Sequence, residues 1–309
     1  MGEVIVAAVA VLIVIIVVSR VAKGMRAKSP DFRGQPPGNL GVREDSRLGP
    51  LANRLELSLS DGYMQNVKKR VLAHGTIKED EYEWYLLEMK RFFIMTSLLK
   101  YVPMYSDKVD EIWHEMIMFT KEYETFCKDF IGEMIHHEPN LKREPDPQQR
   151  AWFDWCYSRL FDMTNETVVM YGEFFRHPLS KQLLANFRDM DRDALMNLYF
   201  RTDVDSAEAK PVTDMLIRET KHQIEESDKG RLTPTVTKGH EHLPTLGLYM
   251  LYFSIVSYDD VDYAAGMSQA TAGTGAGAGS GGFFGGDSDS GSSCGSSCGG
   301  GCGGGCGGA

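Results

Sequence analysis

The fold class is decided by the stretch Lys78-Glu-Asp-Glu-Tyr-Glu-Trp-Tyr-Leu-Leu-Glu-Met-Lys-Arg-Phe-Phe-Ile-Met-Thr-Ser-Leu-Leu-Lys-Tyr101. It opens with acidic residues and ends beside Lys100, which is the order that the helix dipole favours. Its apolar side chains recur at the spacing of a helix that packs against a core. They are Tyr82, Tyr85, Leu86, Met89, Phe92, Phe93, Met95 and Leu99. The pattern predicts one long helix that ends before Pro103.

Helical patterns also precede and follow this stretch. They cover residues 60–74, 107–119, 120–132, 148–163, 166–176, 180–200 and 209–227. The small-residue turns that are typical of β-hairpins are missing from the sequence over 54–242. Only residues 243–256 are ambiguous, because this apolar segment could be a buried helix or a strand. We therefore predict an all-α globular domain over residues 53–258.

The N-terminus carries an unbroken apolar run over residues 4–18. With its neighbours it approaches the roughly 20 apolar residues that a helix needs to cross a bilayer. A cleaved signal peptide fits less well, because the start is acidic and no A-x-A site follows. Positive charges follow the run at Arg20, Lys23, Arg26 and Lys28, and the positive-inside rule places them in the cytoplasm. We predict a single-pass membrane protein with a transmembrane anchor over residues 1–22 in the lipid bilayer and a cytoplasmic domain and tail.

Two further segments have the composition of chain that does not fold by itself. Residues 23–52 are rich in Pro and Gly, which predicts a linker. Residues 259–309 are rich in Gly, Ser and Cys, which predicts a disordered tail, because so few apolar side chains cannot offset the entropy of ordering glycine. Its thiols recur every four residues, at Cys294, Cys298, Cys302 and Cys306. They could chelate a soft metal, carry a lipid, form crosslinks or have no specific role.

The charge balance narrows the classes of partner. The chain holds 33 Lys and Arg against 43 Asp and Glu, a net charge of −10. Nucleic acid is therefore not an expected partner, since phosphate binding needs a surplus of basic residues on one face. A hydrophobic content of 42% excludes a fully disordered chain.

The residues whose side chains could bind a metal or take part in catalysis lie between positions 107 and 137. Asp110 and His114 are one helical turn apart at the edge of an apolar stripe, Cys127 lies in the next helical pattern, and His136 and His137 follow that pattern. A helical hairpin could bring Asp110, His114, Cys127 and one of these two histidines together as a metal site, and nitrogen, sulfur and carboxylate donors suit zinc or iron. The alternative is structural: His114 hydrogen bonds to Asp110 and Cys127 is an inert core residue. No other cofactor is expected.

The same segment resembles the repeated helical motif of the glycine-rich domain-containing proteins. The motif runs Asp-x-x-Trp-His, then a helix with Tyr and Cys, then a histidine before a loop. The matching positions are Asp110, Trp113, His114, Tyr123, Cys127 and His137. The resemblance implies a helical fold, and it implies no reaction because that family has no established enzymatic activity.

Two functions follow from these patterns. The first is an interaction or scaffold protein at the cytoplasmic membrane face with an unknown protein partner, and it is not expected to be an enzyme. The second is a metal-binding domain centred on Asp110, His114, Cys127 and His137, which could act as a metalloenzyme. An exposed His114 beside a second donor would favour the metal site. A buried His114 paired only with Asp110 would favour the scaffold.

Overall fold

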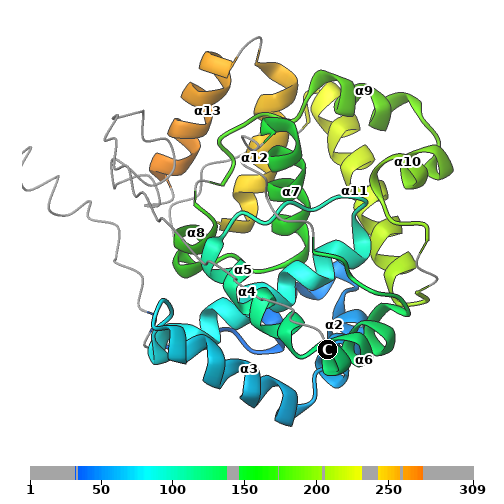
Figure 1. The fold of residues 1–309 in the computed structure, drawn as a ribbon. Helices are drawn as coiled ribbons and strands as arrows, with labels where there is room; N and C mark the ends of the chain where they lie inside the picture. Colours follow the sequence, from blue (N-terminus) through cyan, green and yellow to red (C-terminus); the bar gives the residue numbers. More distant parts are fainter. Residues whose placement is uncertain are drawn as a thin grey trace, which may run out of the picture.

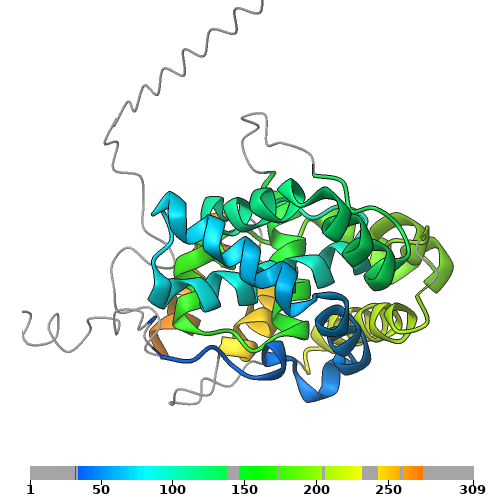
Figure 2. The same cartoon turned by 60° about the horizontal axis from the view of Figure 1, so that its bottom comes forward.

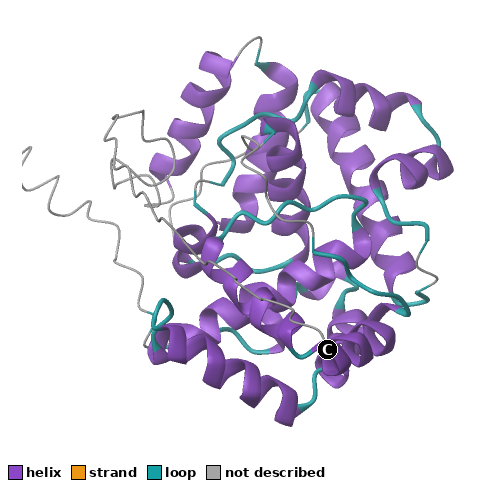
Figure 3. Ribbon diagram, viewed as in Figure 1, coloured by secondary structure: helices purple, strands orange, loops and turns teal. Residues whose placement is uncertain are grey.

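The computed structural model describes residues 32, 34–137, 146–172, 174–203, 206–231, 243–257 and 260–273. In this part of the chain every regular element is a helix (Figure 3), and the only β contacts are the isolated bridges Val42–Phe161 and Leu99–Phe200. The predicted helical character of the domain agrees with this architecture. Residues 243–256, which could have been a strand, form a helix.

The first group of helices surrounds α4 (Figure 1). It comprises α2 (Gly49–Ser58), α3 (Asp61–His74), α4 (Glu79–Leu98), α5 (Asp107–Met118) and α6 (Thr120–Ile131). Two glycines end helices in the left-handed region that few other residues tolerate: Gly75 after α3, with φ of 77°, and Gly132 after α6, with φ of 85°. Helix α4 contacts α2, α3 and α5, and most of its side chains are buried.

The second group packs on the other side of α4. It comprises α7 (Pro147–Leu160), α8 (Asn165–Tyr171), α9 (Lys181–Asp189), α10 (Arg192–Tyr199), α11 (Ala209–Asp228), α12 (Leu243–Val256) and α13 (Asp260–Gly273). Helix α12 is apolar on all sides because α7, α11 and α13 surround it. The predicted helix over 180–200 is divided into α9 and α10, since Asp191 caps α10 by accepting a hydrogen bond from the amide of Ala194.

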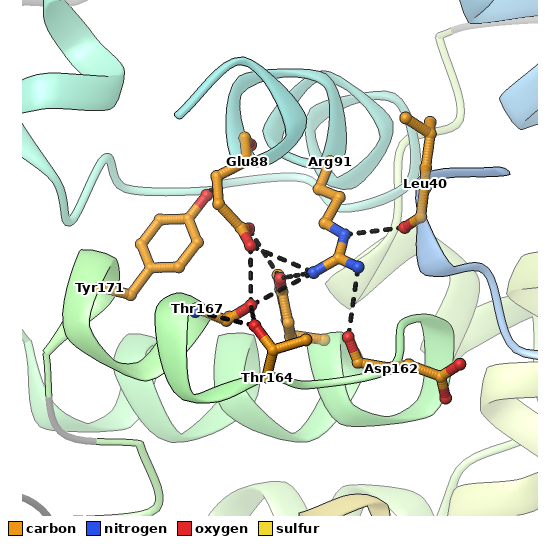
Figure 4. A network of polar contacts seen from close by, with 8 residues as sticks. Leu40, Glu88, Arg91, Asp162, Thr164, Thr167 and Tyr171 are labelled. Carbon is orange, nitrogen blue, oxygen red and sulfur yellow. Dashed lines mark hydrogen bonds and ion pairs between the residues drawn. The ribbon is translucent and has the colours of Figure 1, made fainter. Parts of the chain in front are cut away.

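A buried ionic network joins the two groups (Figure 4). The Arg91 guanidinium pairs with Glu88 on α4 and donates to the hydroxyl of Tyr157 on α7 at 2.6 Å. It also donates to the carbonyl oxygens of Leu40 and Asp162 at 2.8 and 3.2 Å. One side chain thus holds the segment before α2, the end of α7 and the centre of α4 together.

The segment before α2 is therefore part of the folded domain. Leu40 and Leu48 are buried, and two short 3-10 helices, η1 (Asn39–Gly41) and η2 (Glu44–Ser46), precede α2. Figure 2 shows this segment, in blue, along one edge of the helical body. The prediction of a linker over residues 23–52 is wrong for this part, because Leu40 and Leu48 fill the core and Arg91 binds the backbone there.

The predicted tail over residues 259–309 also begins too early. Helix α13 lies inside it, and Tyr263 on α13 is buried and donates a hydrogen bond to the carbonyl of Phe175 at 2.8 Å. A few apolar side chains, among them Tyr263 and Met267, are sufficient to dock this helix. Cys294, Cys298, Cys302 and Cys306 lie outside the described residues.

The membrane predictions are corrected by the helices themselves. Of the helices in the described part of the chain, none combines the length and the hydrophobicity that crossing a bilayer requires. For the described part of the chain, this finding corrects the predicted fold with a single transmembrane helix, and it gives no support to the bilayer as a partner or to the single-pass localisation with a cytoplasmic domain. The segment predicted as the anchor, residues 1–22, lies outside the described residues.

Candidate metal centre

Helix α5 positions the first two predicted ligands. Val109, Ile112 and Met116 form its buried stripe, so the residues at the edge of that stripe face the surface beside the core. Asp110 and His114 lie on this edge one turn apart, with His114 Nε2 3.6 Å from Asp110 Oδ2. The Asp110 side chain is 24% exposed and the His114 side chain is 57% exposed.

The third residue comes from the segment after α6. Gly132 ends α6, and the chain turns so that His137 reaches Asp110, with 2.8 Å between His137 Nε2 and Asp110 Oδ1. The rings of His114 and His137 lie 4.6 Å apart between centroids. One potential ligand atom of each of the three residues lies within 4.8 Å of the others. Two imidazoles and one carboxylate therefore converge on one point at the surface.

A hydrogen-bond chain lies directly beneath this cluster. The indole N–H of Trp113 donates to the hydroxyl of Tyr123 at 2.8 Å, and that hydroxyl donates to the carbonyl of Ile135 at 2.7 Å. Burial raises the pKa of Tyr123, so the hydroxyl stays protonated and can donate. The ring of His137 packs on Trp113 with 4.4 Å between centroids.

A cleft of about 810 Å³ opens beside the cluster, with Asp110, Trp113 and His137 in its wall. Apolar side chains such as Phe92, Leu99 and Met104 also line it. Its other polar side chains include Thr96, Lys100, Glu133, His136, Arg201 and Asp203. His114 is outside the lining, so the three-residue cluster lies at the rim between the cleft and solvent.

The other predicted site residues lie elsewhere. Cys127 is fully buried in the core, and burial raises the pKa of its thiol, which keeps it from the thiolate form that binds metals. Within the described residues it is not part of the group formed by Asp110, His114 and His137. His136 is exposed and lines the cleft, whereas its neighbour His137 joins the cluster.

Sequence reasoning missed one contact that shapes the cleft. Arg201, in the segment after α10, pairs with Glu133 just after α6 and with Asp203, whose Oδ2 lies 2.8 Å from Arg201 Nη2. Arg201 and Glu133 are far apart in the sequence, and no local pattern marks either one. The bridge between Leu99 and Phe200 brings the end of α10 to the end of α4, and Arg201, the next residue, lies in the wall of the cleft.

Comparison with known proteins corrects the predicted family. The family described as UCP032817-like matches residues 56–166, which include α3 to α6 and Asp110, His114 and His137. The match is not to the glycine-rich domain-containing proteins, so the predicted resemblance is wrong. Neither a curated protein nor a solved structure matches this chain.

Proposed function

We propose that this protein binds one divalent transition-metal ion, Zn²⁺ or Fe²⁺, through Asp110, His114 and His137. The observation that carries the proposal is the exposure of His114 beside a second imidazole. A structural histidine is usually buried against its partner, but the His114 side chain is 57% exposed while His137 takes the direct hydrogen bond to Asp110. Three donors thus meet where an ion can enter from solvent.

The donor distances support a metal. An ion about 2.0–2.2 Å from each ligand requires ligand atoms roughly 3–3.5 Å apart. The separations are 2.8 Å from His137 Nε2 to Asp110 Oδ1 and 3.6 Å from His114 Nε2 to Asp110 Oδ2, and one ligand atom of each of the three residues lies within 4.8 Å of the others. Coordination of one ion would therefore require side-chain rotations that bring the three ligand atoms closer together. Two histidines and one carboxylate are the ligands of catalytic zinc sites and of non-haem Fe(II) sites.

The position of the cluster gives such an ion a chemical role. Three protein ligands leave coordination positions for water or a substrate. Asp110 and His137 line the cleft of about 810 Å³, so the open positions would face a space large enough for a small molecule. There the ion would polarise a bound group or lower the pKa of a bound water.

Metal binding by the full chain, stripped of metal, tests the proposal. We expect one equivalent of Zn²⁺ to bind in competition with a chromophoric chelator, and a parallel anaerobic titration with Fe²⁺ shows which ion binds more tightly. His114→Ala, His137→Ala and Asp110→Asn should each weaken binding at least tenfold, because each removes one of three ligands. Cys127→Ser should weaken binding much less than these three variants, since the buried thiol is not one of the clustered donors.

His74 supplies the matched control. Its side chain is 48% exposed, and its nitrogens lie 3.4 Å from Glu111 Oε1 and 3.6 Å from Glu115 Oε1. His74→Ala therefore removes an exposed histidine beside two carboxylates of the same helix α5, and it should not change the metal affinity. Equal losses in His74→Ala and His114→Ala, or no stoichiometric binding by the wild type, would contradict the proposal. The scaffold role stays a prediction, without its membrane component.

A further inference from the structure

Beneath the metal centre, the backbone that carries His137 is bound by a side chain from outside its own segment. Residues 132–137 form no helix, and His137 has to stay beside α5 for its Nε2 to lie 2.8 Å from Asp110. Two positions before His137, the carbonyl of Ile135 accepts a hydrogen bond from the hydroxyl of Tyr123 at 2.7 Å. Tyr123 belongs to α6, which precedes the segment, so this bond folds the segment back onto its own helix.

The same hydroxyl is bound to the helix that carries the other two ligands. Trp113, between Asp110 and His114 on α5, donates its indole N–H to Tyr123 at 2.8 Å. Tyr123, Trp113 and Ile135 are exposed by only 2%, 5% and 5%, so water cannot replace these bonds easily. One hydroxyl therefore connects α5 with the backbone next to His137.

We infer that Tyr123 is a positioning residue of the metal centre, which it serves without touching the ion. Its hydroxyl fixes the Ile135 carbonyl relative to Trp113, and the indole of Trp113 in turn supports the ring of His137 at 4.4 Å. Groups behind the ligands commonly decide how well a metal site is formed, and their loss costs about 10–100-fold in metal affinity. This inference rests on the proposed function, because it assigns Tyr123 a role at that same site.

Tyr63 provides a control of the same chemistry. It is a buried tyrosine of the same half of the domain, and its hydroxyl donates to the carbonyl of Met116 on α5 at 2.9 Å. Tyr63→Phe and Tyr123→Phe each remove one buried hydroxyl group, which makes one of these hydrogen bonds at Tyr63 and two at Tyr123. Of the two tyrosines only Tyr123 binds the segment of His137, whereas a purely structural role predicts similar effects of the two variants on the metal site.

The first measurement is the affinity of the full chain for Zn²⁺ and the absorption spectrum of the Co²⁺ form. We expect Tyr123→Phe to weaken Zn²⁺ binding about 10–100-fold and to alter the Co²⁺ bands, which report ligand geometry. Tyr63→Phe should stay within twofold of the wild type with unchanged bands. Equal affinities and spectra in Tyr123→Phe and the wild type would overturn the inference, as would equal losses in both variants.

The second measurement needs no metal. In the metal-free chain, the ring protons of His137 should show a ring-current shift from Trp113 in their NMR signals. Tyr123→Phe should reduce that shift and broaden the signals, and Tyr63→Phe should not. If the wild type binds no metal but Tyr123→Phe still moves the His137 signals selectively, the proposed function fails and the positioning of His137 holds. Unmoved signals overturn the inference whatever the metal result.

A second variant covers a failure of Tyr123→Phe to fold. Trp113→Phe keeps an aromatic ring on α5 but removes the N–H that binds the Tyr123 hydroxyl. We expect it to weaken Zn²⁺ binding and broaden the His137 signals in the same direction. Wild-type behaviour in both measurements would overturn the inference.

Discussion

Glu88 and Arg91 form an ion pair at the centre of the molecule, with 3.1 Å between Glu88 Oε1 and Arg91 Nη1 and no exposure of either side chain. They lie one turn apart on α4, and Tyr157 and Thr167 also donate to the Glu88 carboxylate, at 2.6 and 2.9 Å. A buried pair of this kind contributes little when intact, but removing one partner leaves an uncompensated charge.

Arg91→Met should therefore destabilise the protein strongly. We expect the free energy of unfolding to fall by about 3–5 kcal/mol, because Glu88 would remain buried without its counter-charge. Urea unfolding measures this loss. The control is Arg188→Met, whose two bonds to Asp228, each 2.8 Å long, lie at the surface and should be worth about 1 kcal/mol or less. Equal losses in the two variants would contradict this account of the network.

Trp113→Ala should also be costly. The indole is 5% exposed and packs against Phe92 and Phe93, with ring centroids 5.3 and 5.8 Å away. Replacing a buried indole by a methyl group leaves a cavity, which typically lowers the free energy of unfolding by about 3–5 kcal/mol. Thermal unfolding monitored by circular dichroism measures it, and an unchanged midpoint would mean that the indole does not contribute to the core.

The buried carboxyl group of Asp154 should make the stability of the protein depend on pH. Its carboxylate on α7 is fully buried, and burial raises its pKa to about 6 from an ordinary value of 3.8, although Arg150 opposes the shift. Between these values the folded state binds more protons than the unfolded state. The contribution of Asp154 to stability is therefore fully present below pH 4 and is lost as the pH rises through 6, by about 2–3 kcal/mol.

The measurement compares wild type with Asp154→Asn, which does not titrate. The amide oxygen can still accept the hydrogen bond that the backbone N–H of Phe175 donates at 2.7 Å. The free energy of unfolding of the wild type should fall relative to that of the variant as the pH rises from about 4 to 7. A difference that stays constant over this range would show that Asp154 does not titrate as its burial implies.

Gly247 on α12 should resist substitution by alanine. An added Cβ would lie 2.3 Å from Ser158 Oγ and 3.1 Å from Ser158 Cβ on α7, so the two helices would have to move apart. We expect a loss of about 1–3 kcal/mol. Gly62 on α3 has nothing within 4 Å of such an atom, and Gly62→Ala should instead stabilise by about 0.4–1 kcal/mol. Urea unfolding measures both changes in the free energy of unfolding, and a decrease in Gly247→Ala with an increase in Gly62→Ala would confirm that α12 packs closely on α7.

The sequence by itself determined helices α3 to α6 of the first group and one pair of the candidate site. The ends of α3 and α6 follow from Gly75 and Gly132, and the spacing of Asp110 and His114 along α5 places them one turn apart. These features are local, because a helix relates each side chain to those three and four residues away whatever surrounds it.

Only the tertiary structure decided which other residues join that pair. The choice of His137 over His136 and Cys127 depends on the path of residues 132–137, which no helical period governs and which Tyr123 and Arg201 hold from two sides. In the same way Arg91 draws Leu40 and the rest of the segment before α2 into the domain, although its composition is typical of a linker. Contacts between distant residues are set by how helices pack, and a pattern read along one chain carries no record of that packing.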